Sequence, residues 1–589
     1  MDDNIRPAAY PAAWQVPFDA AGPLAVAPPA PFDATDDGFY RQPYWAERYT
    51  GFESGVKEYP AGYVTHEGGP ALQVALRKDQ DTAIELRDGT VIYADVFRAA
   101  DTPADAKLPA ILAWSPYGKT TPKNVLSYKR YFTPVPAHLT SGFAQVEGPD
   151  PAYWIQHGYA VVNVDHRGVN KSAGDVHWWG SVNAADTHDV IEWIAEQPWS
   201  NGKVGLSGVS WLGVQQWWAA ADNPPEALAA IAPRSHFHDV LRQFVRIGGI
   251  TGGVSATALI SQICQAIMGE QRRERMDVMV DDQPLNNAYW ADKTAKVENI
   301  DIPVYQVAGP AMLSSATFPF LPDGNKWLRL APSYHLDDYY TPAALETERR
   351  FFDRYLKDID NGWERDTPIV QISVLEPGRE TSGPARIRTA RSWPVENTAY
   401  RKLYLDPATA TLGDTLPATQ EHARYDARTG KATFSYTFSQ DTEVTGFLKV
   451  KLWVEAKDAT DMDLFINAAK VAGAAAVPVG SGQQRVSLRE LDHHATHWLP
   501  IPSLTTNRFL APGEVVPVEI SLRSTFLIFR AGEQLVLDIS GNPGVFLPPL
   551  PSMPRQQLSD TDSANQGSHV IRSGGELDSF LQIPTLPLE

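Results

Sequence analysis

The segment KVGLSGVSWLGVQQWWAA, residues 203–220, decides the fold of this chain. It begins as a short apolar run with small residues and continues as a helix-compatible stretch rich in Trp, Gln and Ala. At the junction, Gly208 lies two positions before Ser210 and Gly213 lies three positions after it. A serine on a sharp strand-to-helix turn needs small neighbours, because the backbone there is strained and larger side chains would collide. We therefore interpret Ser210 as a candidate nucleophile.

The spacing around Ser210 leaves alternatives open. The strict pattern G-x-S-x-G would place the second glycine one position earlier than Gly213. A Gly/Ser turn without a catalytic role fits the same residues, and Ser207 is a rival nucleophile within the segment. The rest of the chain has to supply the context that separates these interpretations.

Composition and charge limit the class of protein. A length of 589 residues predicts more than one domain, and an apolar content of 43% is enough for sizeable cores. The net charge of −19 argues against nucleic-acid binding, which needs basic patches. The single cysteine, Cys264, excludes an intrachain disulfide.

Targeting and cofactor motifs are not found in the sequence. The N-terminus MDDNIRPAAYPAAW is acidic where a signal peptide is positive, and no apolar run approaches a membrane span. There is no Cys/His cluster with zinc spacing and no phosphate-type glycine loop. We expect a cytoplasmic protein that needs no cofactor or metal, acts on a small-molecule substrate and contacts neither nucleic acid nor membrane; a homodimer is left open.

The order of expected elements divides the chain into four parts. Residues 1–70, rich in Pro, Ala and Tyr, predict an N-terminal arm. Strands and helices alternate over 71–234 and 301–365, which predicts a mostly parallel sheet covered on both faces. Residues 235–300 interrupt this rhythm and predict a helical cap above the carboxyl ends of the strands. Short alternating segments over 366–589 predict an antiparallel sandwich, or jelly roll.

Particular segments support these assignments. Arg87-Asp88-Gly89 lies between two strand-like runs and predicts a hairpin. Pro368 to Val374 alternates and is assigned to the sandwich as its first strand. Lys326 to Ala331 is a candidate last strand of the parallel sheet, and His335 follows it. In α/β-hydrolases the triad comes in the order Ser, acid, His, with the histidine after the last strand, so His335 is the candidate base.

With these motifs in place, the sequence resembles the family of serine hydrolases that comprises cocaine esterase, X-Pro dipeptidyl-peptidase and α-amino-acid ester hydrolases. The resemblance covers roughly residues 80 to 570. It is carried by the hairpin at Arg87-Asp88-Gly89, Pro116-Tyr117-Gly118-Lys119, Asp165-His166-Arg167-Gly168, Trp193 through Trp199, Gly208 through Gly213, Pro332 to His335, and Phe529-Arg530-Ala531-Gly532.

The resemblance implies an α/β-hydrolase domain with a helical cap and a C-terminal jelly roll that packs over the site. It also implies Ser210 as nucleophile and His335 as base, with the Tyr117 hydroxyl and the Trp211 backbone N–H as the oxyanion hole. A phenol near the end of one strand and the amide after the nucleophile can converge on one oxygen.

One departure from the family pattern bears on the chemistry. After the strand Val304 to Gly309 the family carries Gly-Trp-x-Asp, and this Asp is the triad acid; here the position is Met312. Loss of such an acid costs about four orders of magnitude in a standard triad. Asp239 and Asp323 are the candidate substitutes, ahead of Asp337 and Asp338.

Other residues of these motifs are assigned to the structure rather than to the chemistry. Asp165 and Arg167 are expected to form a buried structural pair. The alternative interpretation of Tyr117 is a core aromatic residue whose hydroxyl is hydrogen-bonded. Packing is expected for most of the tryptophans near the motifs, with Trp211 a candidate wall of an aromatic acyl pocket: Trp154, Trp178, Trp179, Trp211, Trp217 and Trp218.

The sequence as a whole predicts a serine hydrolase that cleaves an ester or amide through an acyl-enzyme. Met312 keeps two alternatives open. The first is a Ser-His enzyme that cleaves a carbon–carbon bond or catalyses a non-hydrolytic reaction of specialised metabolism. The second is a catalytically inactive binding homologue.

Overall fold

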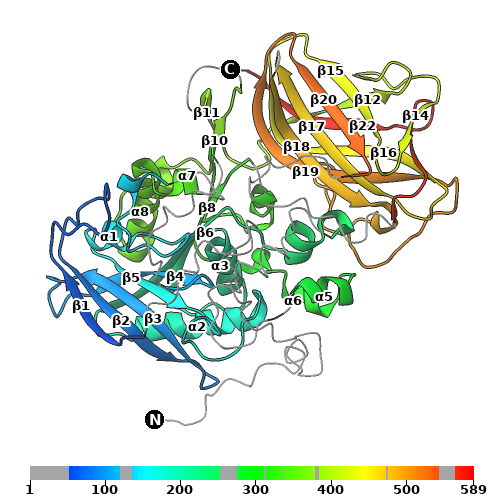
Figure 1. The fold of residues 1–589 in the computed structure, drawn as a ribbon. Helices are drawn as coiled ribbons and strands as arrows, with labels where there is room; N and C mark the ends of the chain where they lie inside the picture. The colour runs from blue at the N-terminus through cyan, green and yellow to red at the C-terminus, as the bar shows by residue number, and fades with distance from the viewer. Residues whose placement is uncertain are drawn as a thin grey trace.

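The computed structural model describes residues 52–119, 135–251, 274, 276–310, 313–333, 336–377, 384–472, 475–542 and 564–588. Two lobes dominate its shape, an α/β lobe coloured blue to green and a β lobe coloured yellow to red (Figure 1). Between the lobes lie short helices, which include α5 (Met276–Asp282) and α6 (Ala288–Asp292).

The α/β lobe is built on one sheet, which has eleven strands among the described residues. Its spatial order is β1-β2-β3-β5-β4-β6-β7-β8-β9-β10-β11, and the strands from β5 to β10 run parallel. Their bounds are β1 Gly55–Tyr59, β2 Leu76–Glu85, β3 Val91–Ala99, β4 Leu108–Ser115, β5 Ala160–Asp165, β6 Ser200–Val209, β7 Leu228–Arg234, β8 Val304–Ala308, β9 Lys326–Leu330, β10 Val370–Val374 and β11 Arg386–Ala390.

Helices cover both faces of this sheet, because the parallel strands are apolar on both sides. Within β4, Ala110 and Leu112 belong to the core on the side of α2 and α3, whereas Ile111 packs on the side of α1 and α8. The helices are α1 Pro151–Ile155, α2 Gly180–Ala195, α3 Trp211–Ala221, α7 Leu336–Tyr339, α8 Pro342–Leu356 and α9 Trp363–Asp366. The alternating order predicted for this part of the chain is therefore present.

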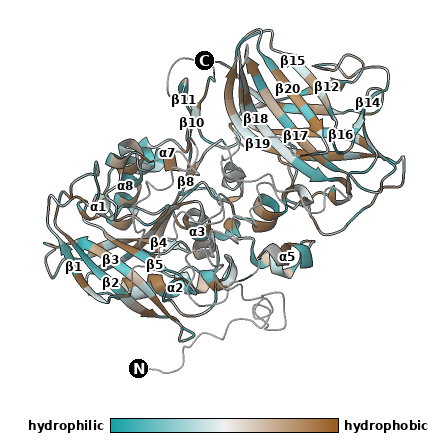
Figure 2. Ribbon diagram, in the orientation of Figure 1, coloured by the Kyte–Doolittle hydropathy of each residue, from teal (hydrophilic) through white to brown (hydrophobic). Residues whose placement is uncertain are grey.

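The β lobe consists of strands around a second apolar core, and all their pairings among the described residues are antiparallel except that of β13 with β15. Its strands are β12 Ala399–Asp406, β13 Thr411–Gly413, β14 Glu421–Asp426, β15 Lys431–Thr437, β16 Thr442–Lys457, β17 Asp463–Ala472, β18 Ala475–Arg485, β19 Val515–Phe529, β20 Gln534–Ser540, β21 Ser568–Ser573 and β22 Phe580–Leu586. Apolar and polar residues alternate along them (Figure 2), which is the pattern of strands with one face in a core. We call this lobe the sandwich.

Two expectations need correction. Pro368 to Val374 was assigned to the sandwich, but β10 pairs in parallel with β9 and so extends the first sheet. The expected N-terminal arm falls partly outside the described residues, since 1–51 are not described, and its later part contributes β1, which pairs with β2. The local pattern of β10 gave no indication of which sheet it would join.

The region expected to form a helical cap is described in part, because residues 252–273 and 275 lie outside the described ranges. Its described elements are one turn of π-helix at Leu241–Val245, 3-10 turns at Ile247–Gly249 and Val297–Asn299, and α5 and α6. This segment reaches the sandwich, since the Gln483 amide donates to the carbonyl oxygens of Ile247 and Ile250 at 2.9 and 3.3 Å.

Candidate active site

Ser210 lies at the turn between β6 and α3, at the carboxyl edge of the parallel sheet. Its backbone has φ 55° and ψ −119°, in the left-handed half of conformational space that L-residues avoid. Its N–H donates to the carbonyl oxygen of Arg234 at the end of β7, at 2.9 Å, and its own carbonyl accepts the first helical bond of α3 from Val214. Such strain persists only where the surroundings enforce it, and it concentrates at functional sites.

Two glycines allow this turn to form. A Cβ on Gly208 would lie 2.4 Å from the Leu212 Cβ, and a Cβ on Gly213 would lie 2.5 Å from the Arg234 carbonyl oxygen. The close approach of α3 to the end of β7 therefore requires glycine at 213, one position later than the strict pattern. We call residues 208–213 the Ser210 turn.

Ser207 is separated from Ser210 by burial rather than by spacing. Gly205 precedes it by two positions, so the sequence pattern alone does not exclude it. In the structure, Ser207 is 1% exposed, and its hydroxyl is hydrogen-bonded to the Tyr339 hydroxyl at 2.7 Å and to the Glu348 carboxylate. This hydroxyl is held inside the protein, whereas Ser210 is partly exposed.

Tyr117 and Trp211 lie beside the Ser210 turn. Tyr117 follows β4, which is the neighbour of β6 in the sheet, and its ring meets the Trp211 ring edge-on with centroids 6.3 Å apart. Trp211 is the first residue of α3, so its backbone N–H has no acceptor within the helix. The two groups expected as oxyanion donors therefore come from adjacent segments.

The candidate base and the position of the usual acid cannot be placed, because His335 and Met312 lie outside the described residues. The candidate substitutes can. Asp239 is 5% exposed, but both of its carboxylate oxygens are bonded to Arg242, by the backbone N–H at 2.8 Å and by the guanidinium at 2.7 Å. The Asp323 side chain is fully exposed at the surface, 3.1 Å from Lys326. Neither setting favours the role of a triad acid.

Aromatic rings surround the Ser210 turn on one side. The Trp179 ring stacks on Trp211 with centroids 4.1 Å apart, and it meets Phe237 and Phe244 edge-on at 5.0 and 5.8 Å. Trp178 also contacts Trp211, at 4.8 Å. These rings pack against one another, as expected, and they give the turn an apolar neighbour.

His166 lies behind Trp211, roughly parallel to its ring at 6.4 Å. Its Nδ1 bonds to the Arg167 carbonyl oxygen at 2.8 Å, and complete burial lowers its pKa to about 4. A neutral imidazole with this setting fills the core beneath the site.

The expected pairing of Asp165 with Arg167 is wrong, although both side chains are buried. Asp165 accepts from Lys119, through its N–H at 2.5 Å and its ammonium at 3.2 Å. Arg167 instead binds both oxygens of Asp186 on α2, each at 2.7 Å. Asp165 is the last residue of β5 and Arg167 lies beyond the strand, and each is paired with a residue remote in sequence.

Sequence reasoning missed two residues next to the Ser210 turn. Glu147 is 2% exposed, has a left-handed backbone with φ 63°, and accepts at its carbonyl oxygen from the Val209 N–H at 2.9 Å. Arg234 supports Ser210 as described above, and it is 2% exposed. No local pattern distinguishes either residue, because its role depends on contacts across the fold.

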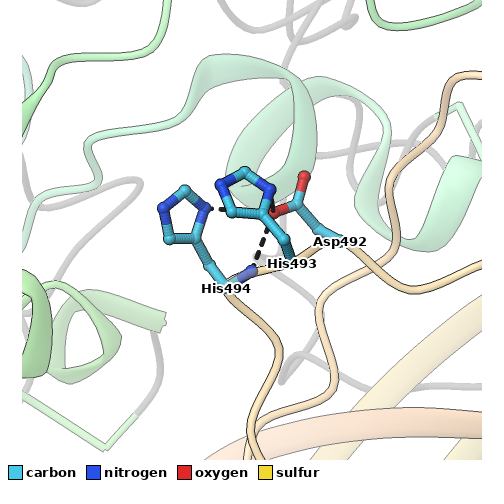
Figure 3. Close-up of side chains that lie close together, drawn as sticks. All are labelled: Asp492, His493 and His494. Atoms are coloured by element: carbon cyan, nitrogen blue, oxygen red, sulfur yellow. Dashed lines mark hydrogen bonds and ion pairs between the residues drawn. The ribbon is translucent and has the colours of Figure 1, made fainter.

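One group of described residues has the composition of a metal site, Asp492, His493 and His494 (Figure 3). Both imidazole Nδ1 atoms lie 3.0 Å from Asp492 Oδ1, which also accepts the His494 N–H. The other carboxylate oxygen lies 3.1 Å from the Arg242 guanidinium. The histidines are 80% and 55% exposed, and their contacts with Asp492, a hydrogen bond for His494 and an ion-pair distance for His493, account for the arrangement.

Comparisons with known proteins agree with the geometry. Residues 88–311 match the X-Pro dipeptidyl-peptidase (S15) family, and residues 361–582 match the X-Pro dipeptidyl-peptidase C-terminal non-catalytic domain. The crystal structure of a CocE/NonD family hydrolase from Staphylococcus aureus is 31% identical with a TM-score of 0.82, over 91% of this chain and 97% of that one.

Two further relatives are more distant. Cocaine esterase from Rhodococcus sp. (strain MB1 Bresler) is 23% identical over 78% of this chain and 90% of its own length. A structure of α-amino acid ester hydrolase is 16% identical with a TM-score of 0.66, covering 87% of this chain and 97% of that one, which supports the fold alone. The predicted fold, an α/β-hydrolase with a C-terminal β-rich domain, is confirmed.

Proposed function

The chain belongs to the CocE/NonD family of hydrolases, and we propose that it cleaves an ester or amide bond of a small molecule or short peptide through an acyl-enzyme on Ser210. The observation that carries this proposal is the conformation of Ser210, with φ 55° at the partly exposed turn between β6 and α3. A nucleophile elbow has this backbone because it lifts the serine hydroxyl out of the sheet towards the substrate.

The reaction follows from the roles of four residues. Ser210 Oγ attacks the acyl carbon while His335 accepts its proton, and the carbonyl oxygen becomes an oxyanion. The Tyr117 hydroxyl and the Trp211 N–H donate to that oxygen, where one such donor is worth about 10²–10³ in kcat. The imidazolium then protonates the leaving group, and a water molecule activated by His335 hydrolyses the acyl-enzyme.

Met312 at the usual acid position shapes the proposal. Without a carboxylate, the imidazolium formed during attack loses its partner, and substrates with good leaving groups are favoured. Asp239 and Asp323 remain formal candidates for this role, but the contacts of Asp239 with Arg242 and the exposure of Asp323 weigh against them. The names of the relatives refer to ester and X-Pro peptide bonds, and the proposal covers both.

The same methionine favours a second candidate function. A Ser-His pair without an acid suits an enzyme that cleaves a carbon–carbon bond or rearranges a specialised metabolite without water. An inactive binding homologue is the third candidate, against which the strained Ser210 backbone argues.

A fluorophosphonate probe tests the proposal, since it reacts with an activated serine. We expect wild type to be labelled. Ser210→Ala should lose labelling, with turnover reduced by at least about 10³, whereas Ser207→Ala should keep both. If only Ser207→Ala loses labelling, Ser207 rather than Ser210 is the nucleophile. An unlabelled wild type would support the inactive binding homologue. If the protein is labelled but does not turn over activated aryl esters, the second candidate is supported.

A further inference from the structure

A buried network of charges joins the Ser210 turn to the helix that follows His335 in the sequence. Its arginines are Arg234 at the end of β7 and Arg329 on β9, and its acids are Asp338 on α7 and Glu348 on α8. Arg234, Asp338 and Glu348 are 2%, 8% and 1% exposed. Charges are buried in this way only where they are paired.

Asp338 is the centre of the network. It accepts from Arg234 at 2.6 Å through one oxygen, and from Nη1 and Nη2 of Arg329 at 2.5 and 2.7 Å. Burial opposes ionisation, but the two arginines prevail and lower the pKa of Asp338 to about 2. A carboxylate committed to two cations cannot also serve as a triad acid, which removes Asp338 from the candidates for that role.

Arg234 carries the connection from Asp338 to the nucleophile. Its guanidinium lies between Asp338 and Glu348, and over the Tyr339 ring with 5.1 Å to the centroid. Its backbone carbonyl accepts from Ser210 N–H, and the same backbone contacts Gly213. One residue therefore holds α7 with its side chain and the Ser210 turn with its main chain.

A second contact runs parallel to this one. Tyr339, the residue after Asp338, hydrogen-bonds Ser207 Oγ on β6, three residues before Ser210. Because α7 begins at Leu336, directly after His335 in the sequence, the network restrains the segment that follows the candidate base.

We propose that Asp338 is a positioning residue for the proposed reaction. Through Arg234 and Arg329 it holds α7 in a fixed position relative to the Ser210 turn. The inference rests on the proposed function for its effect on turnover, but the coupling it describes is a property of the fold. The network thereby restrains α7, the helix that begins directly after the candidate base in the sequence.

Asp353 on α8 provides a matched control. It is 5% exposed and, like Asp338, binds two cations, Arg349 at 2.5 Å and Lys357 at 2.9 Å. Its third partner is Tyr159, directly before β5, so its contacts lie on the α1 side of the sheet. Asp353→Asn therefore removes an equivalent buried charge away from the Ser210 turn.

The experiment compares Asp338→Asn with Asp353→Asn in the full chain. Hydrogen exchange is followed for peptides covering 205–214, and kcat and KM are measured with an activated aryl ester. We expect Asp338→Asn to speed exchange at the Ser210 turn and lower kcat by at least about tenfold, with KM changed less than threefold. Asp353→Asn should leave both as in wild type, whatever its effect on melting temperature.

Equal exchange at 205–214 in the two variants would overturn the inference. If wild type neither reacts with the probe nor turns over the ester, the proposed function fails, yet the exchange comparison still decides the coupling. Should Asp338→Asn not fold, Arg329→Lys weakens the same network while keeping its charge, and it is judged by the same two measurements. If Asp338→Glu restores both the exchange at 205–214 and kcat to wild-type values, the result supports positioning by the carboxylate charge.

Discussion

The ring of Tyr117 meets the ring of Trp211 at 71°, with centroids 6.3 Å apart. The contact joins the end of β4 to the first residue of α3. It places the phenol next to the N-terminal end of α3, where the first backbone amides have no acceptor within the helix. If these two groups are the oxyanion donors that we propose, the contact limits how far the phenol can move relative to the amide, as preorganised donors require.

Tyr117→Phe should lower kcat by about 10²–10³ and change KM little, because it removes one donor to the developing oxyanion and keeps the ring. The edge-on contact with Trp211 survives, so the melting temperature should stay close to that of wild type. Steady-state kinetics with an activated ester measures the effect. An unchanged kcat would remove Tyr117 from the mechanism.

Gly213→Ala should destabilise the protein by about 1–3 kcal/mol, as overpacking does, and abolish labelling by the probe. The added Cβ would lie 2.5 and 2.9 Å from backbone atoms of Arg234, which cannot move aside as a side chain could. Gly413→Ala, at a position with open space around the new Cβ, is the control and should change stability by less than about 0.5 kcal/mol. Urea unfolding compares the two; equal stabilities would contradict the tight packing of the turn.

Asp239→Asn should lower kcat by no more than about tenfold, whereas loss of a triad acid costs about 10⁴. The reason is that both carboxylate oxygens already bind Arg242, which in turn binds the carbonyl oxygens of Pro502 and Ser503 in the sandwich. The variant should therefore mainly lower the melting temperature. A loss near 10⁴ in a stably folded variant would instead identify Asp239 as the substitute acid.

Acidification should weaken the fold through its buried histidines. The pKa of His166 is lowered to about 4 by burial, whereas in the unfolded chain it is about 6.5. Between these values the unfolded chain binds the extra proton, so stability falls as pH falls from about 6.5 to 4 and is fully present above 6.5. From pH 7 to pH 5 this histidine accounts for about 2 kcal/mol.

Urea unfolding of His166→Asn at pH 7 and pH 5 measures this contribution. The variant should be less stable than wild type at pH 7, because a stacked side chain is lost, but the difference between the two pH values should shrink by about 2 kcal/mol. His422 on β14 is exposed and provides the control, since the same substitution there removes an imidazole from the surface rather than from the core. An undiminished pH difference would show that His166 is not the group responsible.

The sequence predicted the strands and helices around Ser210 because their apolar residues recur with clear periods. The hairpin around Asp88 is confirmed by the antiparallel pairing of β2 with β3, and the strand before Ser210 and the helix after it are both present. The segment Pro368 to Val374 shows where this reasoning stops. Alternation identifies a strand, but the sheet that a strand joins depends on the position of its neighbours in space.

The site divides in the same way. The sequence by itself determined a serine between two closely spaced glycines, because a left-handed backbone and a close approach of helix to strand leave a local signature at Gly208, Ser210 and Gly213. Through the family resemblance it also predicted that Met312 occupies the position of the usual acid, which stays a prediction because Met312 lies outside the described residues.

Only the tertiary structure decided which of two nearby serines is buried and which charges are paired. Ser207 meets Tyr339 and Glu348, more than 100 residues away in the chain, and Asp338 pairs with Arg234, 104 residues away, as well as with the nearby Arg329. The partners of a buried polar group depend on which segments the two cores bring together. Because burial of an unpaired polar group is costly, the fold provides a partner wherever such a group is buried. Such partners have no fixed spacing along the chain, so no local pattern could predict them.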